Sequence, residues 1–134
     1  MDHHAAITAS LELAATRIGD PTAAVYARLF ALHPAMEREF WRDTHGNIRG
    51  EMLNRSFEVI LDLAGPRGWG GQFLATEIHT HSAYGIPPAV FGDFLPIVAA
   101  VIRDGCGDGF APAMAEAWDM VLAEAARLAA TIII

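Results

Sequence analysis

The chain has 134 residues, which is enough for one domain with a hydrophobic core, and we expect a single domain over residues 1–134. Nine Lys and Arg against 16 Asp and Glu give a formal net charge of −7, which excludes a protein that coats nucleic acid with a basic face. Apolar residues make up 53%, too many for a disordered chain, and the single cysteine excludes a disulfide framework. No apolar run reaches the roughly 18 residues of a membrane span, and the start lacks a signal-peptide pattern. We therefore expect a cytoplasmic protein that does not enter membranes.

Clusters of glycine and proline divide the chain, and the segments between them have a helical period. The first predicted helix covers residues 4–18, ends at Gly19, and has an apolar face formed by Ile7, Leu11, Ala14 and Ala15. Asp20-Pro21 predicts the start of a second helix, because Asp caps helices and Pro favours the first turn. The inward face of that helix holds Val25, Tyr26, Leu29, Phe30 and His33. Pro34 ends it, and a short turn over residues 35–40 and a polar loop over residues 41–47 follow.

The second half of the chain predicts four more helices. Residues 48–64 have a continuous apolar stripe, formed by Leu53, Phe57, Ile60, Leu61 and Ala64. The glycine-rich segment 65–68 ends this helix, and further helices are predicted over residues 71–83, over residues 88–103 and from Pro112 onward. No pair of strands is predicted, because the β-branched residues 131–134 have no partner. The class is therefore all-α, with about six helices around one core.

Six histidines are the first candidates for chemistry, but four of them have ordinary explanations. His3 and His4 lie at the start of the chain, His33 lies at a helix end before a proline, and His45 lies in the polar loop. Terminal and capping histidines of this kind are common in proteins without a metal or a catalytic role.

His79 and His81 differ in the helix face on which they lie. Because successive side chains are about 100° apart, the two rings point about 200° apart and cannot bind one metal together. His81 falls in the buried stripe with Leu74 and Ile78, whereas His79 faces away from it. By spacing alone a buried histidine is more often a packed core residue than a ligand. Cys106 is expected to be a loop thiol without catalysis, and the acidic residues are expected on solvent faces.

Several segments together resemble the globin family. The run His81-Ser82-Ala83-Tyr84-Gly85-Ile86 resembles the proximal segment of globins, in which Gly and an aliphatic residue are the fourth and fifth residues after the haem-binding histidine. Residues 29–40 resemble the end of helix B and the helix C turn of bacterial flavohaemoglobin-type globins. Tyr26, fourteen residues before Phe40, matches the distal tyrosine of that group, and Ala117-Trp118 matches the Ala-Trp pair of the last helix. The resemblance covers about residues 5–130.

The resemblance implies a globin-like fold of six to seven helices around a pocket for haem b. It implies that His81 binds the iron and that Tyr26 donates a hydrogen bond to bound oxygen on the opposite side. The distal position on the third helix falls at Ile48 or Arg49, and Arg49 is preferred because Leu53 then lies one turn further along the haem face. Contacts with haem are implied for Phe40, Arg49, Leu53, Phe57, Ile78, Ile86 and Phe94, and contact with the gas for Tyr26 and Arg49.

Two departures from flavohaemoglobins bear on function. In that group a tyrosine and a glutamate polarise the proximal histidine. The matching positions in this chain are Phe91 and Ile133, which cannot do so. The resemblance therefore implies that the histidine donates less electron density to the iron, which disfavours chemistry on the oxygen–oxygen bond. The chain also ends where a reductase domain would begin. We therefore expect binding of oxygen, nitric oxide or carbon monoxide rather than turnover. The alternatives are a nitric-oxide dioxygenase served by a separate reductase, and a sensor module with or without haem. The sequence leaves the oligomeric state open.

Overall fold

The computed structural model of the chain describes residues 2–131, and within this range every regular element is helical. The α-helices are α1 (His3–Ile18), α2 (Thr22–Leu32), α3 (Asn47–Ala64), α4 (Gly70–Ala83), α5 (Pro88–Cys106) and α6 (Pro112–Ala130). Two 3₁₀ helices, η1 (Pro34–Phe40) and η2 (Gly107–Gly109), follow α2 and α5. The predicted all-α class is confirmed for these residues. No helix among residues 2–131 combines the length and the apolar character needed to cross a bilayer.

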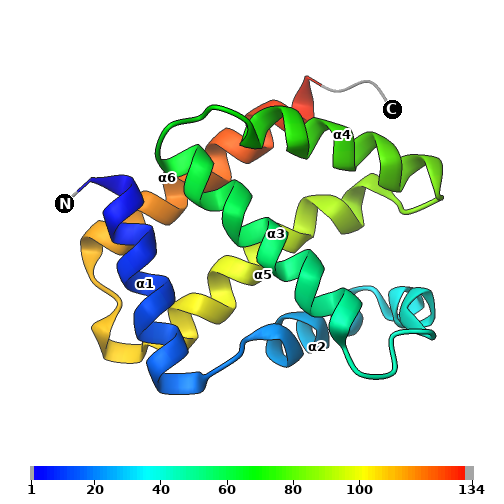
Figure 1. The fold of residues 1–134 in the computed structure, drawn as a ribbon, viewed down its shortest axis with the longest axis horizontal. Coiled ribbons are helices and arrows are strands. Elements are labelled where there is room, and N and C mark those ends of the chain that lie inside the picture. Colours follow the sequence, from blue (N-terminus) through cyan, green and yellow to red (C-terminus); the bar gives the residue numbers. More distant parts are fainter. Residues whose placement is uncertain (1, 132–134) are drawn as a thin grey trace.

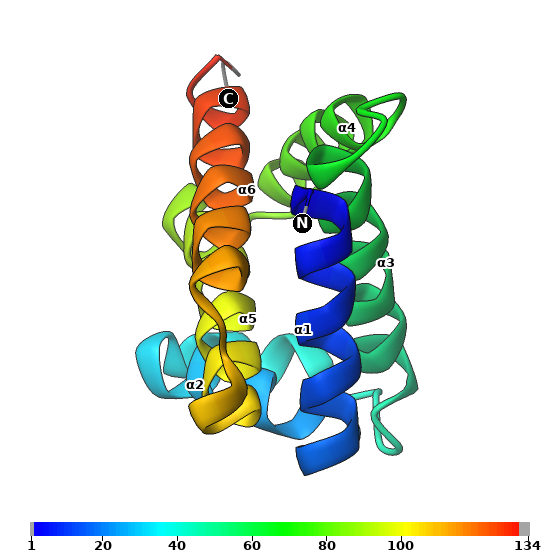
Figure 2. The ribbon, with the colours of Figure 1, turned by 90° about the vertical axis from the view of Figure 1, so that its left-hand side faces the viewer.

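The helices form two layers around the core. In Figure 2, α1 and α3 lie side by side in one layer, and α5 and α6 lie in the layer opposite. α1 packs on both α5 and α6, and α3 crosses over α5 in Figure 1. α4 packs on α3 and α6, whereas α2 packs on α5 and η1. The C-terminal end of α4 and the 3₁₀ helix η1 therefore lie at the same end of the molecule, on the right in Figure 1.

Three buried polar side chains join α1, α5 and α6. Trp118 Nε1 donates to Ser10 Oγ at 2.9 Å, and Ser10 Oγ donates to the carbonyl of Ile7 at 2.7 Å. Cys106 Sγ donates to the carbonyl oxygen of Ser10 at 3.2 Å. The prediction of a loop thiol at Cys106 is wrong, because α5 continues through Gly105 and ends at this buried residue. Gly105 lets α1 pass close to α5, because a Cβ at position 105 would lie 2.9 Å from Ile18.

Two buried carboxylates contradict the expectation that acidic side chains lie on solvent faces. Asp62 accepts hydrogen bonds from the backbone N–H groups of Gly68, Trp69 and Gly70, the last at 2.6 Å. Asp43 accepts from two backbone N–H groups at the start of α3. Both carboxylates are buried because they satisfy helix N–H groups that would otherwise lack acceptors. A second prediction is wrong at Ala15, which the sequence places on the inner face of the first helix but which is exposed in the structure.

Candidate functional site

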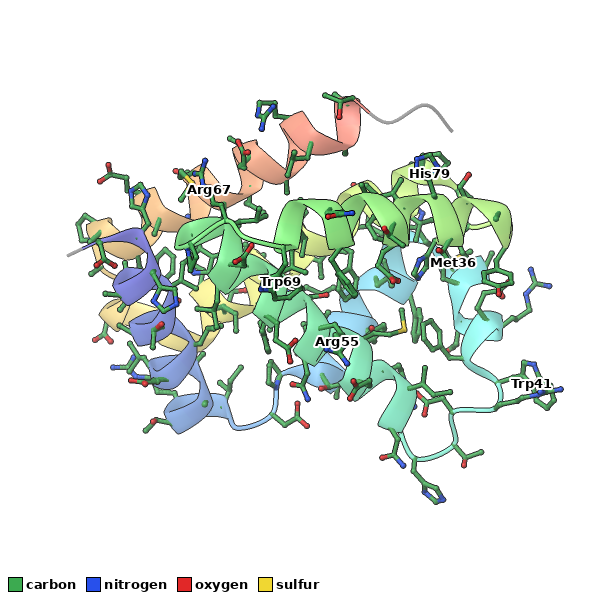
Figure 3. All side chains as sticks on the ribbon, turned by 45° about the horizontal axis from the view of Figure 1, so that its top comes forward. Met36, Trp41, Arg55, Arg67, Trp69 and His79 are labelled. Carbon is green, nitrogen blue, oxygen red and sulfur yellow. The ribbon has the colours of Figure 1, made fainter. Side chains whose placement is uncertain are left out.

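His81 lies in the last turn of α4, on the face that the sequence predicts. Leu74 and Ile78 are buried on the same stripe, and the His81 side chain is 26% exposed. His79 is exposed, and Figure 3 shows its ring at the outer edge of α4. The two histidines therefore lie on different faces, as their spacing predicts.

One hydrogen bond sets the orientation and the tautomer of the His81 ring. Nδ1 lies 2.7 Å from the carbonyl oxygen of Glu77. A carbonyl only accepts, so Nδ1 carries the proton and donates it, and the neutral ring then has its lone pair on Nε2. No hydrogen bond to Nε2 is found among residues 2–131. Histidines that bind metals often have their second ring nitrogen held by a backbone carbonyl in the same way.

The turn after α4 explains why glycine follows His81 at the fourth place. Gly85 has φ of +85°, a left-handed conformation that side chains disfavour, and it ends the helix. The turn brings the N–H of Ile86 to the carbonyl oxygen of His81 at 3.0 Å. Ile86 is thereby held half-buried beside the end of α4, and it packs against the core.

Two phenylalanines of α5 connect the His81 side of the core with the Tyr26 side. Phe91 contacts the His81 ring edge-on, with ring centroids 5.0 Å apart. Phe94, one turn further along α5, lies 5.6 Å from the Tyr26 ring centroid. His81 and Tyr26 therefore pack against adjacent turns of one helix although they are far apart in sequence.

Tyr26 is a buried phenol whose hydroxyl has no partner. Its ring is 2% exposed and contacts Phe30, Phe40 and Phe94, with the Phe40 ring edge-on at 5.4 Å between centroids. The hydroxyl oxygen is buried and has no hydrogen-bond partner among residues 2–131. Burial raises the pKa of Tyr26 well above its usual value, with Arg49 opposing and Asp43 reinforcing this effect. The phenol therefore keeps its proton, and it is a donor that lacks an acceptor.

Tyr26, Phe40 and Arg49 line one pocket of about 1030 Å³ between α2, η1 and the start of α3. Arg49 Nε donates to Asp43 Oδ2 at 3.0 Å, and Arg49 Nη2 donates to the Asp43 carbonyl at 2.9 Å. The guanidinium is thus held at the start of α3, with the side chain 29% exposed. Ile48, the alternative distal residue, is 52% exposed and does not line this pocket.

The other predicted contact residues lie elsewhere in the core. Leu53 and Ile78 are buried, and Phe57, Ile86 and Phe94 are half-buried and pack against the core. None of these five lines the pocket that contains Tyr26. The structure therefore brings Tyr26, Phe40 and Arg49 together directly and connects Tyr26 to His81 through α5. Ile133, the predicted place of a polarising glutamate, lies outside the described residues.

Sequence reasoning missed two side chains beside the site. Glu77 Oε2 lies 3.7 Å from His81 Nδ1, a proximity that the i, i+4 spacing could have indicated. Asp43 holds Arg49, but it lies six residues before it in an irregular loop, so no helical period indicates the contact. No cluster of three or more His, Cys, Asp or Glu within residues 2–131 is placed to hold a metal ion.

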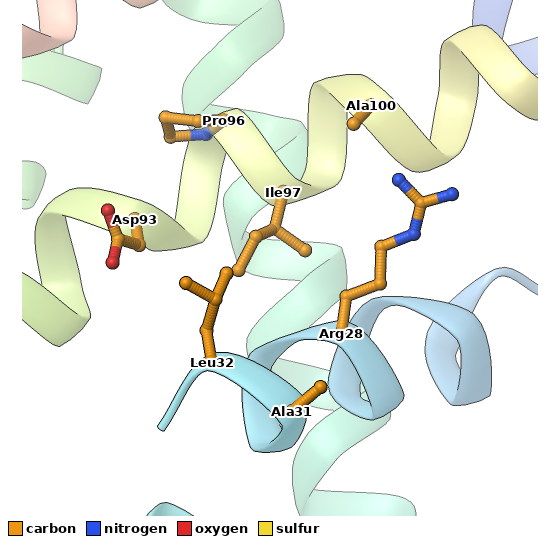
Figure 4. Close-up of a pocket in the computed structure, with 7 residues that line it drawn as sticks. All are labelled: Arg28, Ala31, Leu32, Asp93, Pro96, Ile97 and Ala100. Atoms are coloured by element: carbon orange, nitrogen blue, oxygen red, sulfur yellow. The ribbon is translucent and has the colours of Figure 1, made fainter. Parts of the chain in front are cut away.

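A second hollow, of about 490 Å³, lies between α2 and α5 and contains none of the predicted site residues (Figure 4). Its two charged residues already have partners, since Arg28 pairs with Asp104, and Asp93 Oδ2 lies 2.7 Å from His33 Nε2. The remaining lining is apolar and is formed by Ala31, Leu32, Pro96, Ile97 and Ala100.

The free Nε2 of His81 and the unpartnered hydroxyl of Tyr26 are groups that a haem with a gas ligand would use, but His81 does not line the pocket that contains Tyr26. Haem supplies four nitrogen ligands to its iron, so the protein needs to provide only one more ligand, such as a histidine nitrogen. A buried hydrogen-bond donor without a partner could then interact with a polar gas bound on the other side of the haem. No protein family, curated protein or solved structure matches this chain. The all-α class of residues 2–131 is what the structure establishes.

Proposed function

We propose that this chain is a haem-binding protein of the globin type that binds a diatomic gas. The observation that supports it is that two unusual side chains, one from α4 and one from α2, pack against adjacent turns of α5. The Nδ1–H of His81 donates to the Glu77 carbonyl, which leaves a lone pair on Nε2 of the neutral ring, and Tyr26 has a buried hydroxyl without an acceptor among residues 2–131. A histidine ligand can hold haem iron, and a hydrogen-bond donor on the other side of the haem favours the binding of oxygen.

In this proposal each residue has a distinct task. Haem b, when bound, supplies the iron at which the gas is held. His81 Nε2 is the protein ligand, and the hydrogen bond from Nδ1 to the Glu77 carbonyl keeps the ring from rotating. Apolar contact with the haem ring comes from Leu53, Phe57, Ile78, Ile86, Phe94 and Phe40.

Tyr26 favours oxygen among the possible gases. Bound oxygen carries partial negative charge, so a neutral phenol in a low-dielectric site stabilises it by donating a hydrogen bond. Carbon monoxide is less polar when bound and gains less from the same donor. Arg49 supplies a second donor at the edge of the same pocket, held in place by Asp43.

The Tyr26→Phe substitution tests the proposal, because it removes the hydroxyl and keeps the ring. A hydrogen bond to a charged acceptor is worth roughly 1.5–3 kcal/mol, so oxygen release from the haem-loaded protein should accelerate about 10- to 100-fold. Release of carbon monoxide should change far less. Stopped-flow measurement of both release rates provides the comparison.

Tyr84→Phe is the matched control, because it removes a hydroxyl from a side chain that is 82% exposed. It should leave both rates unchanged. If Tyr26→Phe alters oxygen and carbon monoxide release equally, Tyr26 acts through shape alone, and the hydrogen-bond role is wrong.

A further inference from the structure

Arg67 lies in the turn between α3 and α4, in a backbone conformation that side chains disfavour. Its φ is +57°, and it is the one non-glycine residue among residues 2–131 with a positive φ. Two hydrogen bonds hold it there. The backbone N–H donates to the carbonyl of Asp62 at 2.9 Å, and Nε donates to the carbonyl of Leu63 at 2.9 Å. The end of α3 therefore sets the position of the guanidinium.

The guanidinium of Arg67 points at the sulfur of Met120, on α6. Nη2 donates to Met120 Sδ at 3.2 Å, and Figure 3 shows Arg67 beside the ribbon of α6. Among residues 2–131, the one carboxylate within reach of Arg67 is that of Glu124, 4.0 Å from Nη1. Glu124 already accepts two hydrogen bonds from Arg127, at 2.6 and 3.0 Å. A charged donor is thus directed at a thioether, which is only a weak acceptor.

We propose that Met120 is an oxidation site and that Arg67 binds the oxygen of its sulfoxide, so that the fold tolerates the modified side chain. Oxidation replaces a weak sulfur acceptor with a polar oxygen. The guanidinium already lies at hydrogen-bond distance from the sulfur, so a small shift of the flexible methionine side chain brings that oxygen to it. The inference needs no haem and goes beyond the proposed function.

Exposure and contacts distinguish Met120 from the other methionines that the structure describes. Met120 and Met52 are half-buried, whereas Met36 and Met114 are only 9% and 8% exposed. Within residues 2–131 a charged donor contacts a methionine sulfur at Met120 alone, since Met114 Sδ accepts from the backbone N–H of Ala111. Met52 is therefore the matched comparison, because it is also half-buried but has no charged donor at its sulfur.

A hydroperoxide is the class of oxidant that this chemistry takes, and hydrogen peroxide is the simplest. The sulfur lone pair attacks one peroxide oxygen, so that an S–O bond forms and the O–O bond breaks. The departing hydroxide takes the proton of the transferred oxygen and becomes water. Sulfur loses two electrons and the peroxide gains them.

The alternative is an ordinary methionine whose oxidation disrupts the packing of α6 against the turn. A half-buried sulfoxide without a partner destabilises the fold, because its oxygen gives up water and gains no hydrogen bond. The effect of oxidation on stability, measured with and without the guanidinium, separates the two interpretations.

Three variants and the wild type provide the test. Arg67→Gly removes the guanidinium and keeps the turn, because glycine adopts a positive φ without strain. Met120→Leu and Met52→Leu each remove one half-buried sulfur and nearly conserve the volume. Each protein, with and without the added Arg67→Gly substitution, is treated briefly with hydrogen peroxide. Peptide mass spectrometry locates the oxidised methionines, and urea unfolding is measured before and after treatment.

Met120 should be oxidised before Met36 and Met114. Oxidation should raise the unfolding equilibrium constant of Arg67→Gly about tenfold more than that of the wild type. This difference should persist when Met52→Leu is present and vanish when Met120→Leu is present. Equal responses of the wild type and Arg67→Gly, or oxidation of Met120 no faster than that of the two buried methionines, would overturn the proposal.

Discussion

Asp62, near the end of α3, holds the start of the helix that carries His81. Its carboxylate accepts three successive backbone N–H groups, those of Gly68, Trp69 and Gly70. Burial opposes ionisation of this carboxyl group, but the three donors outweigh it and hold the pKa of Asp62 below its usual value. The side chain thus performs for α4 the task of an N-cap residue, although it belongs to the preceding helix.

Asp62→Ala should lower the free energy of unfolding by roughly 1–2 kcal/mol, the cost of losing a helix cap. Because the folded pKa is depressed, this stabilisation is present above the unfolded value of 3.8 and is lost as pH falls through the lower folded value. Urea unfolding of wild type and Asp62→Ala should therefore differ clearly near neutral pH and converge in strong acid. A difference that stays constant down to about pH 2 would show that the ionised carboxylate is not the cause.

At the scale of the elements, the packing of α1 against α5 and α6 depends on Ser10. Its hydroxyl accepts from Trp118 Nε1, and its carbonyl accepts from Cys106 Sγ, with all three residues buried. Ser10→Ala leaves the indole N–H without an acceptor in the core and should cost roughly 1–3 kcal/mol of unfolding free energy. Thermal or urea unfolding, monitored by tryptophan fluorescence, measures this change.

Ser56→Ala is the control for Ser10→Ala. The Ser56 hydroxyl donates only to the carbonyl of Met52 one turn earlier and is half-buried, so its loss should change stability by less than about 0.5 kcal/mol. Equal effects of the two substitutions would contradict the importance of the Ser10–Trp118 bond.

The ends of the helices were predictable where glycine or proline alone determines them. Gly19, Pro34 and the 65–68 segment end helices within a residue or two of the predicted places, because these residues restrict the backbone directly. The end of α5 was not predictable, because a glycine such as Gly105 usually indicates that a helix ends. Here it allows α1 to approach closely, and only the packing of the two helices shows this.

For the whole molecule, the sequence predicts the all-α class and the faces of His81 and Tyr26, since helical period alone determines them. The contacts around the candidate site were harder to predict from the sequence. The contact between Glu77 and His81 could be predicted, because the two residues are four apart on one helix. The contact between Asp43 and Arg49 could not, because Asp43 lies in an irregular loop. The pocket beside Tyr26 arises from how α2, η1 and α3 meet, which no single segment encodes.

The most direct test of the central claim is a haemin titration followed by visible absorption. For the wild-type protein we expect a Soret band that saturates at one haem per chain, since the proposal assigns His81 as the single protein ligand. His81→Ala should lose or broaden this band, whereas His79→Ala, on the opposite face of α4, should keep it. A wild-type protein that gives no saturable band, or two histidine variants that lose it equally, would contradict haem binding through His81.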